Sequence, residues 1–249
     1  MEVGAEKINP YHGDSRPKTE QVRDMFDSIA PAYDFMNRAM TFGVDKWWRS
    51  VAVNMICKSN PATILDIATG TADLAIKLAD KMPAAHVTGV DLSANMIEIG
   101  RQKVAQRNLS DRIELMTADC LHLPFDDNTF DCITVAYGVR NFEHLDQGYG
   151  EMFRVMKPGG MLVVIELSTP TNQVVKPFYR LYTKHIIPLA GKLVSKDVRA
   201  YSYLPESIAA VPQGDNMLAL IKQAGFDDAR FKTLTFGTCS IYSAKKPLD

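Results

Sequence analysis

Cysteine is scarce in this sequence, and the cysteine positions exclude two kinds of site. The 249 residues contain four cysteines, which stand far apart, form no CxxC motif and have no paired histidines: Cys57, Cys120, Cys132 and Cys239. A structural zinc site needs several such ligands at short spacing, and a disulfide framework is typical of small secreted chains. The sequence therefore predicts no metal site, and it predicts reduced thiols, as in a cytoplasmic protein.

Net charge and long apolar runs are also lacking. The formal net charge is -1, so the chain offers no global positive field, and we expect no nucleic-acid partner. No run approaches the ~18 apolar residues of a membrane span, and the polar residues 1–18 contain no signal-peptide core. We expect a soluble protein that contacts a membrane at most from one face. Residues 1–18 are predicted to be a flexible tail, and residues 19–249 a single domain.

Glycine is scarce where a dinucleotide-binding loop would need it. Residues 63–74, TILDIATGTADL, are typical of a buried strand, a tight loop and a helix start, and the loop contains only Gly70. The dinucleotide fingerprint needs three glycines, and Asp66 and Asp73 would repel a pyrophosphate. A nicotinamide oxidoreductase is therefore disfavoured. S-adenosylmethionine carries an ammonium and a sulfonium, and both cations would gain from these acids.

The chain continues with the alternating strands and helices of a Rossmann-like α/β unit. Residues 86–91 form a second predicted strand, which ends in Asp91, 25 residues after Asp66. That carboxylate can accept both hydroxyls of a ribose, and the alternative is a surface aspartate at a strand end. Ser93 is placed to cap the next helix. Further strands are predicted at 112–117, 132–137 and 161–165, a helix at 149–156 with a turn at 157–160, and an antiparallel hairpin at 231–234 and 239–243.

Residues 19–58 precede the first strand and are predicted to cap the cleft. An apolar helix face begins at Val22, and Pro31 is expected to end this helix. Residues 33–43 are expected to form a connector, and a second helix follows over residues 45–57. On residue types alone, the aromatic side chains in this segment are more typical of packing on the sheet than of a ligand site.

Three stretches resemble a known family. DIATGTAD, at residues 66–73, resembles the first motif of class I S-adenosylmethionine-dependent methyltransferases. YDFMNRAMTFGVDKWW, at 33–48, and RVMKPGGMLVVIELS, at 154–168, resemble the two signatures of the bacterial quinone C-methyltransferases of menaquinone and ubiquinone biosynthesis. The similarity runs from about Thr19 to the end of the chain. It implies a Rossmann-like methyltransferase sheet, mostly parallel with an antiparallel carboxyl-terminal hairpin, plus an amino-terminal helical cap and a helical insertion at about 169–213.

The resemblance also implies roles at the cofactor site. Asp119 would bond the adenine amino group, and the backbone N–H of Cys120 would meet a ring nitrogen, which leaves no part for the thiol. Ala72 and Ala136 depart from the family, where glycine and serine are frequent at these positions. With S-adenosylmethionine as cosubstrate and no metal, the predicted cofactor-binding residues are Asp66, Gly70, Thr71, Asp91, Asp119 and Cys120.

The acceptor is predicted to bind beside the end of the fourth strand, where methyl transfer takes place in this superfamily. Arg140 and Asn141 follow that strand and are predicted to be catalytic contacts, with a salt bridge and a turn cap as the alternative. The resemblance adds Tyr33 as a catalytic contact and Asp34 and Asn37 as its neighbours in the cap. Polar groups among aromatic side chains are suitable contacts for a quinol ring.

Residues 169–213 hold five prolines among many aromatic and aliphatic residues, which is too apolar for a free linker. We predict a helical insertion that covers the site and contacts a polyprenyl tail. The alternative is an ordinary packed insertion or an oligomer contact, so a homodimer and a peripheral contact with the inner face of the membrane are the further partner predictions.

The chemistry predicts a reduced acceptor, because a ring carbon must be electron-rich to attack a methyl sulfonium. We therefore expect a lipophilic demethylquinol, with demethylmenaquinol favoured and a ubiquinone-pathway benzoquinol left open. Arg140 can stabilise a phenolate, but its pKa above about 12 prevents it from acting as the base. Water, Asp34 and His185 remain as proton acceptors. A non-catalytic binding protein is disfavoured because both long signatures are substantially retained.

Overall fold

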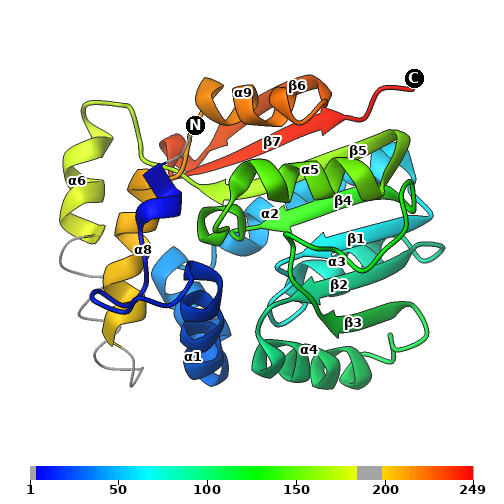
Figure 1. The fold of residues 1–249 in the computed structure, drawn as a ribbon, viewed down its shortest axis with the longest axis horizontal. Helices are drawn as coiled ribbons and strands as arrows, with labels where there is room; N and C mark the ends of the chain where they lie inside the picture. Colours follow the sequence, from blue (N-terminus) through cyan, green and yellow to red (C-terminus); the bar gives the residue numbers. More distant parts are fainter. Residues whose placement is uncertain (1–3, 184–197, 249) are drawn as a thin grey trace.

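The computed structural model describes residues 4–183 and 198–248. Within these ranges seven strands form one sheet, in the order β3-β2-β1-β4-β5-β7-β6 (Figure 1). The strands are β1 (Thr63–Ile67), β2 (His86–Asp91), β3 (Ile113–Thr117), β4 (Phe130–Ala136), β5 (Met156–Leu167), β6 (Asp227–Leu234) and β7 (Cys239–Lys245). The α-helices are α1 (Lys18–Thr41), α2 (Asp45–Ile56), α3 (Asp73–Lys81), α4 (Ala94–Gln106), α5 (Leu145–Val155), α6 (Val175–Leu181), α8 (Val198–Ala210) and α9 (Asp215–Gln223). Short 3-10 helices are η1 (Gly4–Lys7), η2 (Cys57–Ser59), η3 (Val139–Asn141) and η5 (Thr235–Gly237).

The strand directions confirm the predicted fold class. Strands β1 to β5 pair in parallel, whereas β7 pairs antiparallel with both β5 and β6. The register places Asp66 of β1 beside Gly89 of β2 and Thr134 of β4. Because the parallel strands all run the same way, the loops that follow them meet at one edge of the sheet.

Helices cover both faces of the sheet. Helices α2, α3 and α4 pack on one face, and α5 and α9 pack on the other (Figure 1). Strand β1 shows why the sequence produces this arrangement, since Ile64 belongs to one apolar cluster and Leu65 to the other. A strand that is apolar on both sides is typical of a buried parallel sheet.

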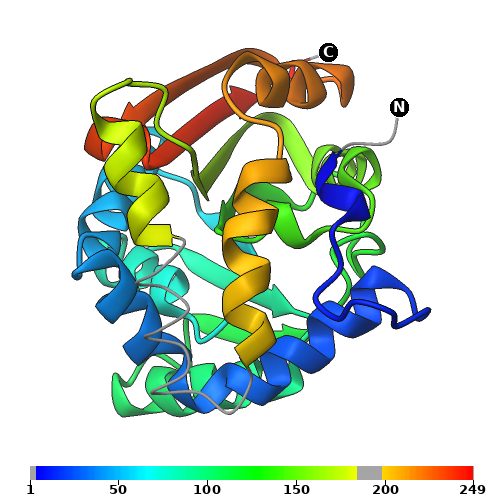
Figure 2. The ribbon, with the colours of Figure 1, turned by 90° about the vertical axis from the view of Figure 1, so that its left-hand side faces the viewer.

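A helical cap formed by α1, α6 and α8 lies beyond the carboxyl ends of the parallel strands (Figures 1 and 2). It has a small apolar core of its own, in which Met25 and Met36 of α1 contact Met96 of α4 and Tyr203 of α8. Helix α1 therefore connects the cap to the sheet.

The prediction that Pro31 ends the first helix is wrong. Helix α1 continues through Pro31 to Thr41, so the predicted connector is helical for most of its length. Proline has no N–H for the carbonyl four residues earlier, which here belongs to Asp27. That carbonyl instead accepts a hydrogen bond from Asn95 Nδ2 at 3.2 Å. A side chain from α4 thus replaces the missing helical hydrogen bond.

The helix stop predicted before residues 157–160 is confirmed, since α5 ends at Val155, but these residues belong to β5 and do not form a separate turn. They interrupt the pairing with β4, in which Phe130 faces Met156 and Cys132 faces Met161. Gly159 N donates to Lys246 O at 2.9 Å, and Lys246 N donates to Gly160 O at 3.0 Å. These bonds to the end of the chain keep the segment in the sheet. Gly159 has φ 77°, a left-handed value that favours glycine.

The amino-terminal residues contact the domain from Gly4 onward. Ala5 is buried, and its carbonyl accepts from Lys18 Nζ at 2.6 Å. These contacts do not measure motion, so the flexibility predicted for residues 1–18 stays a prediction. Of the predicted insertion at 169–213, residues 184–197 lie outside the described ranges. No helix within the described residues is both long and apolar enough to cross a bilayer.

Candidate active site

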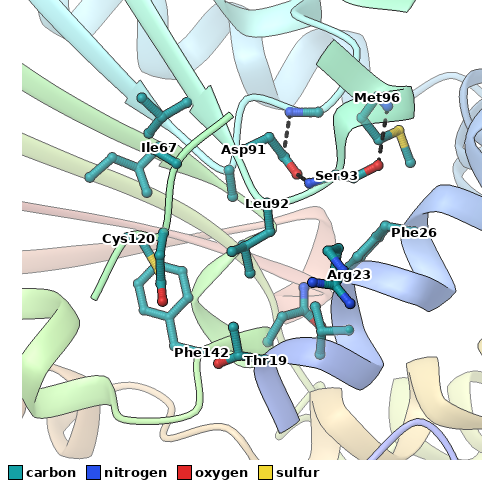
Figure 3. Close-up of a pocket in the computed structure, with 18 of the residues that line it drawn as sticks. Thr19, Arg23, Phe26, Ile67, Asp91, Leu92, Ser93, Met96, Cys120 and Phe142 are labelled. Atoms are coloured by element: carbon teal, nitrogen blue, oxygen red, sulfur yellow. Dashed lines mark hydrogen bonds between the residues drawn. The ribbon is translucent and has the colours of Figure 1, made fainter. Parts of the chain in front are cut away.

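Loops after four neighbouring strands form a cavity at the carboxyl edge of the sheet, which we name the first cavity. From these loops it is lined by Gly70, Asp91, Asp119, Cys120, Tyr137 and Asn141, among others. Helix α1 covers it with Thr19, Arg23 and Phe26 (Figure 3). Tyr33 of the same helix also lines it. Six of the nine predicted site residues thus line one cavity in the described structure, and Asp66, Thr71 and Arg140 do not.

The loop after β1 has a strained backbone. Ala68, Gly70 and Ala72 have φ values of 52°, 56° and 65°, all in the left-handed region. An alanine there costs about 1–2 kcal/mol, and such strain is common at functional sites. Two hydrogen bonds hold the loop, because Thr69 N donates to Val90 O and Ala72 N donates to Thr69 O.

Asp91 lies at the end of β2 with its carboxylate at the first cavity. Its Oδ2 accepts from Gly70 N at 2.8 Å, and its Oδ1 accepts from Ser93 N at 2.9 Å (Figure 3). Burial raises the pKa of Asp91. Ser93 also caps α4, as predicted, since its Oγ accepts from Met96 N at 3.1 Å. The backbone therefore fixes the carboxylate while it still faces the cavity.

Asp66 does not line the first cavity in the described structure. Its two oxygens accept from Thr69 Oγ1 at 2.7 Å and from Thr134 Oγ1 at 2.8 Å. Burial raises the pKa of Asp66 to about 6, although both hydroxyls favour its charged form. In this arrangement Asp66 stabilises the loop through its hydrogen bond with Thr69. Its predicted direct contact with the cofactor stays a prediction.

Thr71 faces α1 and likewise does not line the first cavity in the described residues. Its hydroxyl donates to Asp34 Oδ1 at 2.6 Å. Lys103 Nζ donates to Asp34 Oδ2 at 2.9 Å and also to Asp73. We name these four residues the latch, because they join α1 to the loop after β1 and to α4.

Asp119 and Cys120 line the first cavity after β3. Asp119 Oδ1 accepts from Leu121 N at 2.9 Å, which fixes the carboxylate within its loop. Burial raises the pKa of the Cys120 thiol well above its usual value, so the thiol stays protonated. A protonated thiol is a poor nucleophile. The side chain therefore offers no chemistry, in line with a role for the backbone of Cys120.

A second cavity, of about 260 Å³, lies beside the first one under the helical cap. Its lining is mostly apolar and comes from α1, α2, α6, α8 and η5, and it includes Trp48, Leu167, Tyr179, Tyr182, Leu204 and Ile208. In the described residues, Tyr33 and Tyr137 line both cavities. These two side chains therefore mark the boundary between the cavities.

Arg140 and Asn141 are both buried in η3, next to that boundary. Arg140 donates from Nη1 to Glu166 Oε1 at 2.8 Å and to the carbonyl of Tyr137. The salt bridge considered from the sequence is therefore present. Four buried polar atoms have no hydrogen-bond partner within the described residues: Arg140 Nε, Asn141 Oδ1, Tyr137 Oη and Tyr203 Oη. Orphan polar atoms are rare in proteins and favour a site that a polar ligand completes.

Tyr137 has a positive φ of 61°, which is uncommon for a bulky residue. The Arg49 guanidinium lies 5.1 Å from the centre of its ring, and the Trp48 ring lies 6.4 Å away. Burial raises the pKa of Tyr137 well above its usual value, despite the opposing effect of Arg49. The phenol therefore stays protonated and can donate a hydrogen bond.

A sequence model of the ubiE/COQ5 methyltransferase family matches residues 15–246 of this chain. The chain belongs to this family. The demethylmenaquinone methyltransferase of Bacteroides fragilis is 47% identical over 246 residues, which are 99% of this chain and 100% of that protein. The ubiquinone/menaquinone biosynthesis C-methyltransferase UbiE of Geotalea daltonii is 42% identical over 230 residues, or 92% of this chain and 97% of that protein.

Solved structures agree with the fold of this UbiE/COQ5 family member. The cyclase SpnF has a TM-score of 0.70 at 18% identity, and the match covers 94% of this chain and 98% of that one. A SAM-dependent methyltransferase from Aquifex aeolicus has a TM-score of 0.56 at 19% identity, over 77% of this chain and 88% of that one. Because a cyclase shares the fold, function has to be argued from the site.

In this UbiE/COQ5 family chain, the sequence singled out neither Tyr137 nor Tyr203, and it named no partner for a salt bridge of Arg140. Tyr137 could have been found, because it directly follows the strand that opens to Arg140. The contact of Tyr203 with the site depends on how α8 packs, which the sequence does not reveal. The candidate base His185 lies outside the described residues. Across residues 4–183 and 198–248, no group of three or more His, Cys, Asp or Glu side chains could hold a metal ion.

Proposed function

We propose that this chain transfers the methyl group of S-adenosylmethionine to a ring carbon of a polyprenylated demethylquinol, with demethylmenaquinol as the acceptor. Membership of the UbiE/COQ5 methyltransferase family supports the reaction. The name of the Bacteroides fragilis relative, a demethylmenaquinone methyltransferase, supports this acceptor. A ubiquinone-pathway benzoquinol is the second candidate, because the name of the Geotalea daltonii relative includes both quinones.

The observation that carries the proposal is the meeting of two different cavities at Tyr33 and Tyr137. The first cavity has carboxylates at Asp91 and Asp119, which suit the hydroxyls and amino group of a nucleoside. The second cavity is mostly apolar, which suits a lipophilic ring. A donor in the first and an acceptor in the second would meet at the boundary. Holding both reactants in line supplies much of the rate of such a reaction.

The first cavity fits S-adenosylmethionine, which supplies an electrophilic methyl group when bound. We assign the ribose hydroxyls to Asp91 and the adenine to Asp119 and the backbone of Cys120. Gly70 leaves room beside the ligand, since a Cβ there would meet nothing closer than Tyr33 Cε1 at 3.8 Å. Asp66 and Thr71 act indirectly in this proposal, through the shape of the loop.

The acceptor reacts as its phenolate, and the orphan atoms support this choice. A phenol with pKa about 10 is ionised in roughly one part in a thousand at pH 7, a handicap of about 4 kcal/mol. Arg140 Nε is a charged donor without a partner in the described residues, so it is available to a phenolate oxygen. Asn141 Oδ1 accepts only, and it is available to the second hydroxyl of a quinol. An oxidised quinone has no such hydroxyl to donate.

Proton removal from the ring completes the reaction. The electron pair of the ring carbon forms the new C–C bond, the C–S bond breaks, and the proton on that carbon then leaves. Asp34 is engaged by Thr71 and Lys103, so it is a poor candidate for the base. Water and His185 remain as proton acceptors in this proposal.

We further propose that the protein works in the cytoplasm without a metal. All four cysteines are unpaired, which supports a reducing compartment. A homodimer remains a proposal that light scattering can test.

Transfer of radiolabelled methyl groups tests the proposed function. The assay offers demethylated naphthoquinol and benzoquinol analogues without a prenyl tail, each in its reduced and its oxidised form. We expect label on the reduced naphthoquinol and none on either oxidised ring. Calorimetry in parallel should show micromolar-scale binding of S-adenosylmethionine and no binding of NADH. Label on the oxidised rings alone, or tight NADH binding without S-adenosylmethionine binding, would contradict the proposal.

A further inference from the structure

Large apolar side chains are exposed at one end of the molecule. Phe42 is 81% exposed, Phe236 is 80% exposed and Phe178 is 71% exposed, although monomeric proteins rarely display such side chains in groups. We name the following six residues the apolar rim: Phe42, Trp47, Val174, Phe178, Leu181 and Phe236.

The apolar rim lies next to the second cavity, because the segments that carry it also contribute Phe42, Trp48 and Thr235 to the lining. Phe42 lines this cavity and is also highly exposed, so the cavity reaches the surface there. The Phe42 ring lies 6.1 Å from the ring of Tyr182, which follows α6 and lines the same cavity. Trp48 Nε1 donates to Thr235 Oγ1 at 2.8 Å, which joins the start of α2 to the 3-10 helix that carries Phe236.

The contributing segments lie on the same side of the molecule in Figure 2, where α6, the β6–β7 end and the junction of α1 with α2 are close together. Val174, Phe178 and Leu181 stand at i, i+4 and i+7, so they share one face of α6. Tyr179 and Thr183, on another face of this helical segment, line the second cavity. The α6 segment thus presents one apolar face to the outside and contributes Tyr179 and Thr183 to the lining of the cavity.

Charge around the rim favours an anionic surface. Residues 168–183, which carry three of the six rim residues, contain no acidic residue. Lys46, beside Trp47, is exposed. An exposed aromatic side chain next to a lysine is typical of protein segments that lie in the interface of a membrane.

We propose that the apolar rim docks on an anionic lipid bilayer and holds the opening of the second cavity against it. A prenylated quinol would then enter the cavity ring first while its tail stays in the lipid. This inference rests on the proposed function, because it takes a lipophilic acceptor for granted.

A bilayer fits this surface better than a second copy of the chain. The rim includes Phe42, which both lines the second cavity and is exposed at its opening. A second copy seated on the rim would cover that opening and block the acceptor. A bilayer would cover the same side chains and at the same time supply the acceptor.

Sedimentation with vesicles tests the docking. The vesicles contain phosphatidylcholine alone or with about one quarter phosphatidylglycerol, in the range where anionic lipid attracts basic segments. The test variant combines Phe178→Ser, Leu181→Ser and Phe236→Ser, none of which lines either cavity. The matched control is Leu248→Ser, an exposed apolar residue on the carboxyl-terminal tail.

We expect wild type and Leu248→Ser to bind the anionic vesicles, and the triple variant to bind at least about tenfold more weakly. A second variant, Lys46→Glu, should weaken binding to anionic vesicles only. Thermal unfolding verifies that all variants fold. Wild-type vesicle binding that is absent, or that persists unchanged in the triple variant, would overturn the inference.

Turnover with two different quinols tests the docking and the proposed function separately. With a tail-free, water-soluble quinol the triple variant should match wild type within about twofold, whereas with a long-chain quinol in vesicles its rate should fall at least about tenfold. If wild type does not methylate the tail-free quinol, the proposed function fails whatever the vesicles show. If light scattering finds a wild-type dimer that the triple variant splits, and neither binds vesicles, the rim is a subunit interface and the inference is wrong.

Discussion

Arg140 belongs to a buried ion pair, and in the proposed function it also stabilises the phenolate, so a single substitution would change both. Its Nη1 lies 2.8 Å from Glu166 Oε1, and the exposed fractions of the two side chains are 7% and 2%. Removing one partner of a buried ion pair costs about 3–5 kcal/mol, because the other charge remains buried and uncompensated. Arg140→Gln alone should therefore lower the melting temperature as well as the turnover. The sequence did not reveal this cost, because it did not identify Glu166 as the partner of Arg140.

The double variant Arg140→Gln with Glu166→Gln separates these roles. We expect it to recover most of the melting temperature that Arg140→Gln loses, because no charge remains unpaired. Its turnover should stay about ten- to a thousandfold below wild type, the range for one lost charge-stabilising donor. The defect should shrink as pH rises, since hydroxide then ionises the quinol without help from the protein. Methyl transfer over a pH series, normalised to folded protein, measures this. Wild-type turnover in the double variant would remove Arg140 from the mechanism.

Asp66 gives a prediction about pH and stability. Burial raises its pKa from 3.8 to about 6, so the folded state binds a proton more tightly than the unfolded state. Stability therefore falls as pH rises from about 4 to about 6, by about 3 kcal/mol in total, at 1.36 kcal/mol for each pKa unit. Asp66→Asn should lack this dependence and should be more stable than wild type at pH 7.

Melting curves of wild type and Asp66→Asn between about pH 4 and pH 7 provide the measurement. The stability of the variant is subtracted from that of wild type at each pH, because other groups titrate in this window as well. The affinity of Asp66→Asn for S-adenosylmethionine tests whether Asp66 contacts the cofactor directly. An indirect role through Thr69 and Thr134 predicts a change of less than about threefold, whereas a direct contact with a cation predicts at least tenfold. A difference in stability that is constant over this window would show that Asp66 is already ionised.

Among the structural elements, η3 and its neighbours depend on one buried lysine. Lys18 begins α1, is 3% exposed, and donates from Nζ to the carbonyls of Ala5, Arg140 and Phe142 at 2.6, 3.3 and 3.2 Å. A cation at a helix amino terminus opposes the helix dipole. Burial lowers the pKa of Lys18 to about 8, although Glu6 and Glu143 oppose this shift. Such an unfavourable placement suggests a positioning role for the loop that carries Arg140.

Lys18→Met should therefore loosen η3 without removing a residue that lines either cavity. We expect the turnover number to fall about tenfold, because η3 loses one to two hydrogen bonds to a charged donor. The Kd for S-adenosylmethionine should change by less than about threefold. Wild-type turnover should also decline above about pH 8, as Lys18 loses its proton, and the variant should lack this decline. The exposed Lys58→Met is the control. A lower melting temperature with unchanged turnover per folded molecule would contradict the positioning role.

Elements held by local patterns were predictable, and those held by distant partners were not. Strand β1 and its loop follow from one apolar run and Gly70, and the helix cap at Ser93 follows from its own sequence position. Helix α1 was cut short in the prediction, because the donor that rescues Pro31 is Asn95, 64 residues away in the chain. The segment 157–160 was predicted as a separate turn for the same reason, since its partner Lys246 lies near the other end of the chain.

The candidate site was predictable in a similarly uneven way. Asp91 and Asp119 each follow a parallel strand, and the topology alone brings them to the first cavity. Asp66 and Thr71 stand in the same motif but face Thr134 and Asp34, which only the packed structure shows. A motif therefore identifies the loop more reliably than it identifies which of its side chains touch the ligand.

For the whole molecule, the structure describes a closed arrangement of cap and sheet. Helix α1 covers the first cavity through Thr19, Arg23, Phe26 and Tyr33. We therefore expect α1 to move away when the cofactor enters. The latch, in which Lys103 contacts Asp34 and Asp73, resists this motion.

Lys103→Met should weaken the closed arrangement and accelerate exchange of the cofactor. We expect the dissociation rate of S-adenosylmethionine to rise about tenfold, which corresponds to about 1.4 kcal/mol, a reasonable value for a partly buried network of two ion pairs. Stopped-flow fluorescence gives this rate, and hydrogen exchange in α1 should be faster in the variant and slower in wild type with cofactor. Arg107→Met is the matched control, because Arg107 stands just beyond the end of the same helix and pairs with Asp80 in an exposed ion pair. If both variants released the cofactor at the wild-type rate, the latch would not control the cap, and another contact of α1, such as Asp27 with Ser93, would have to do so.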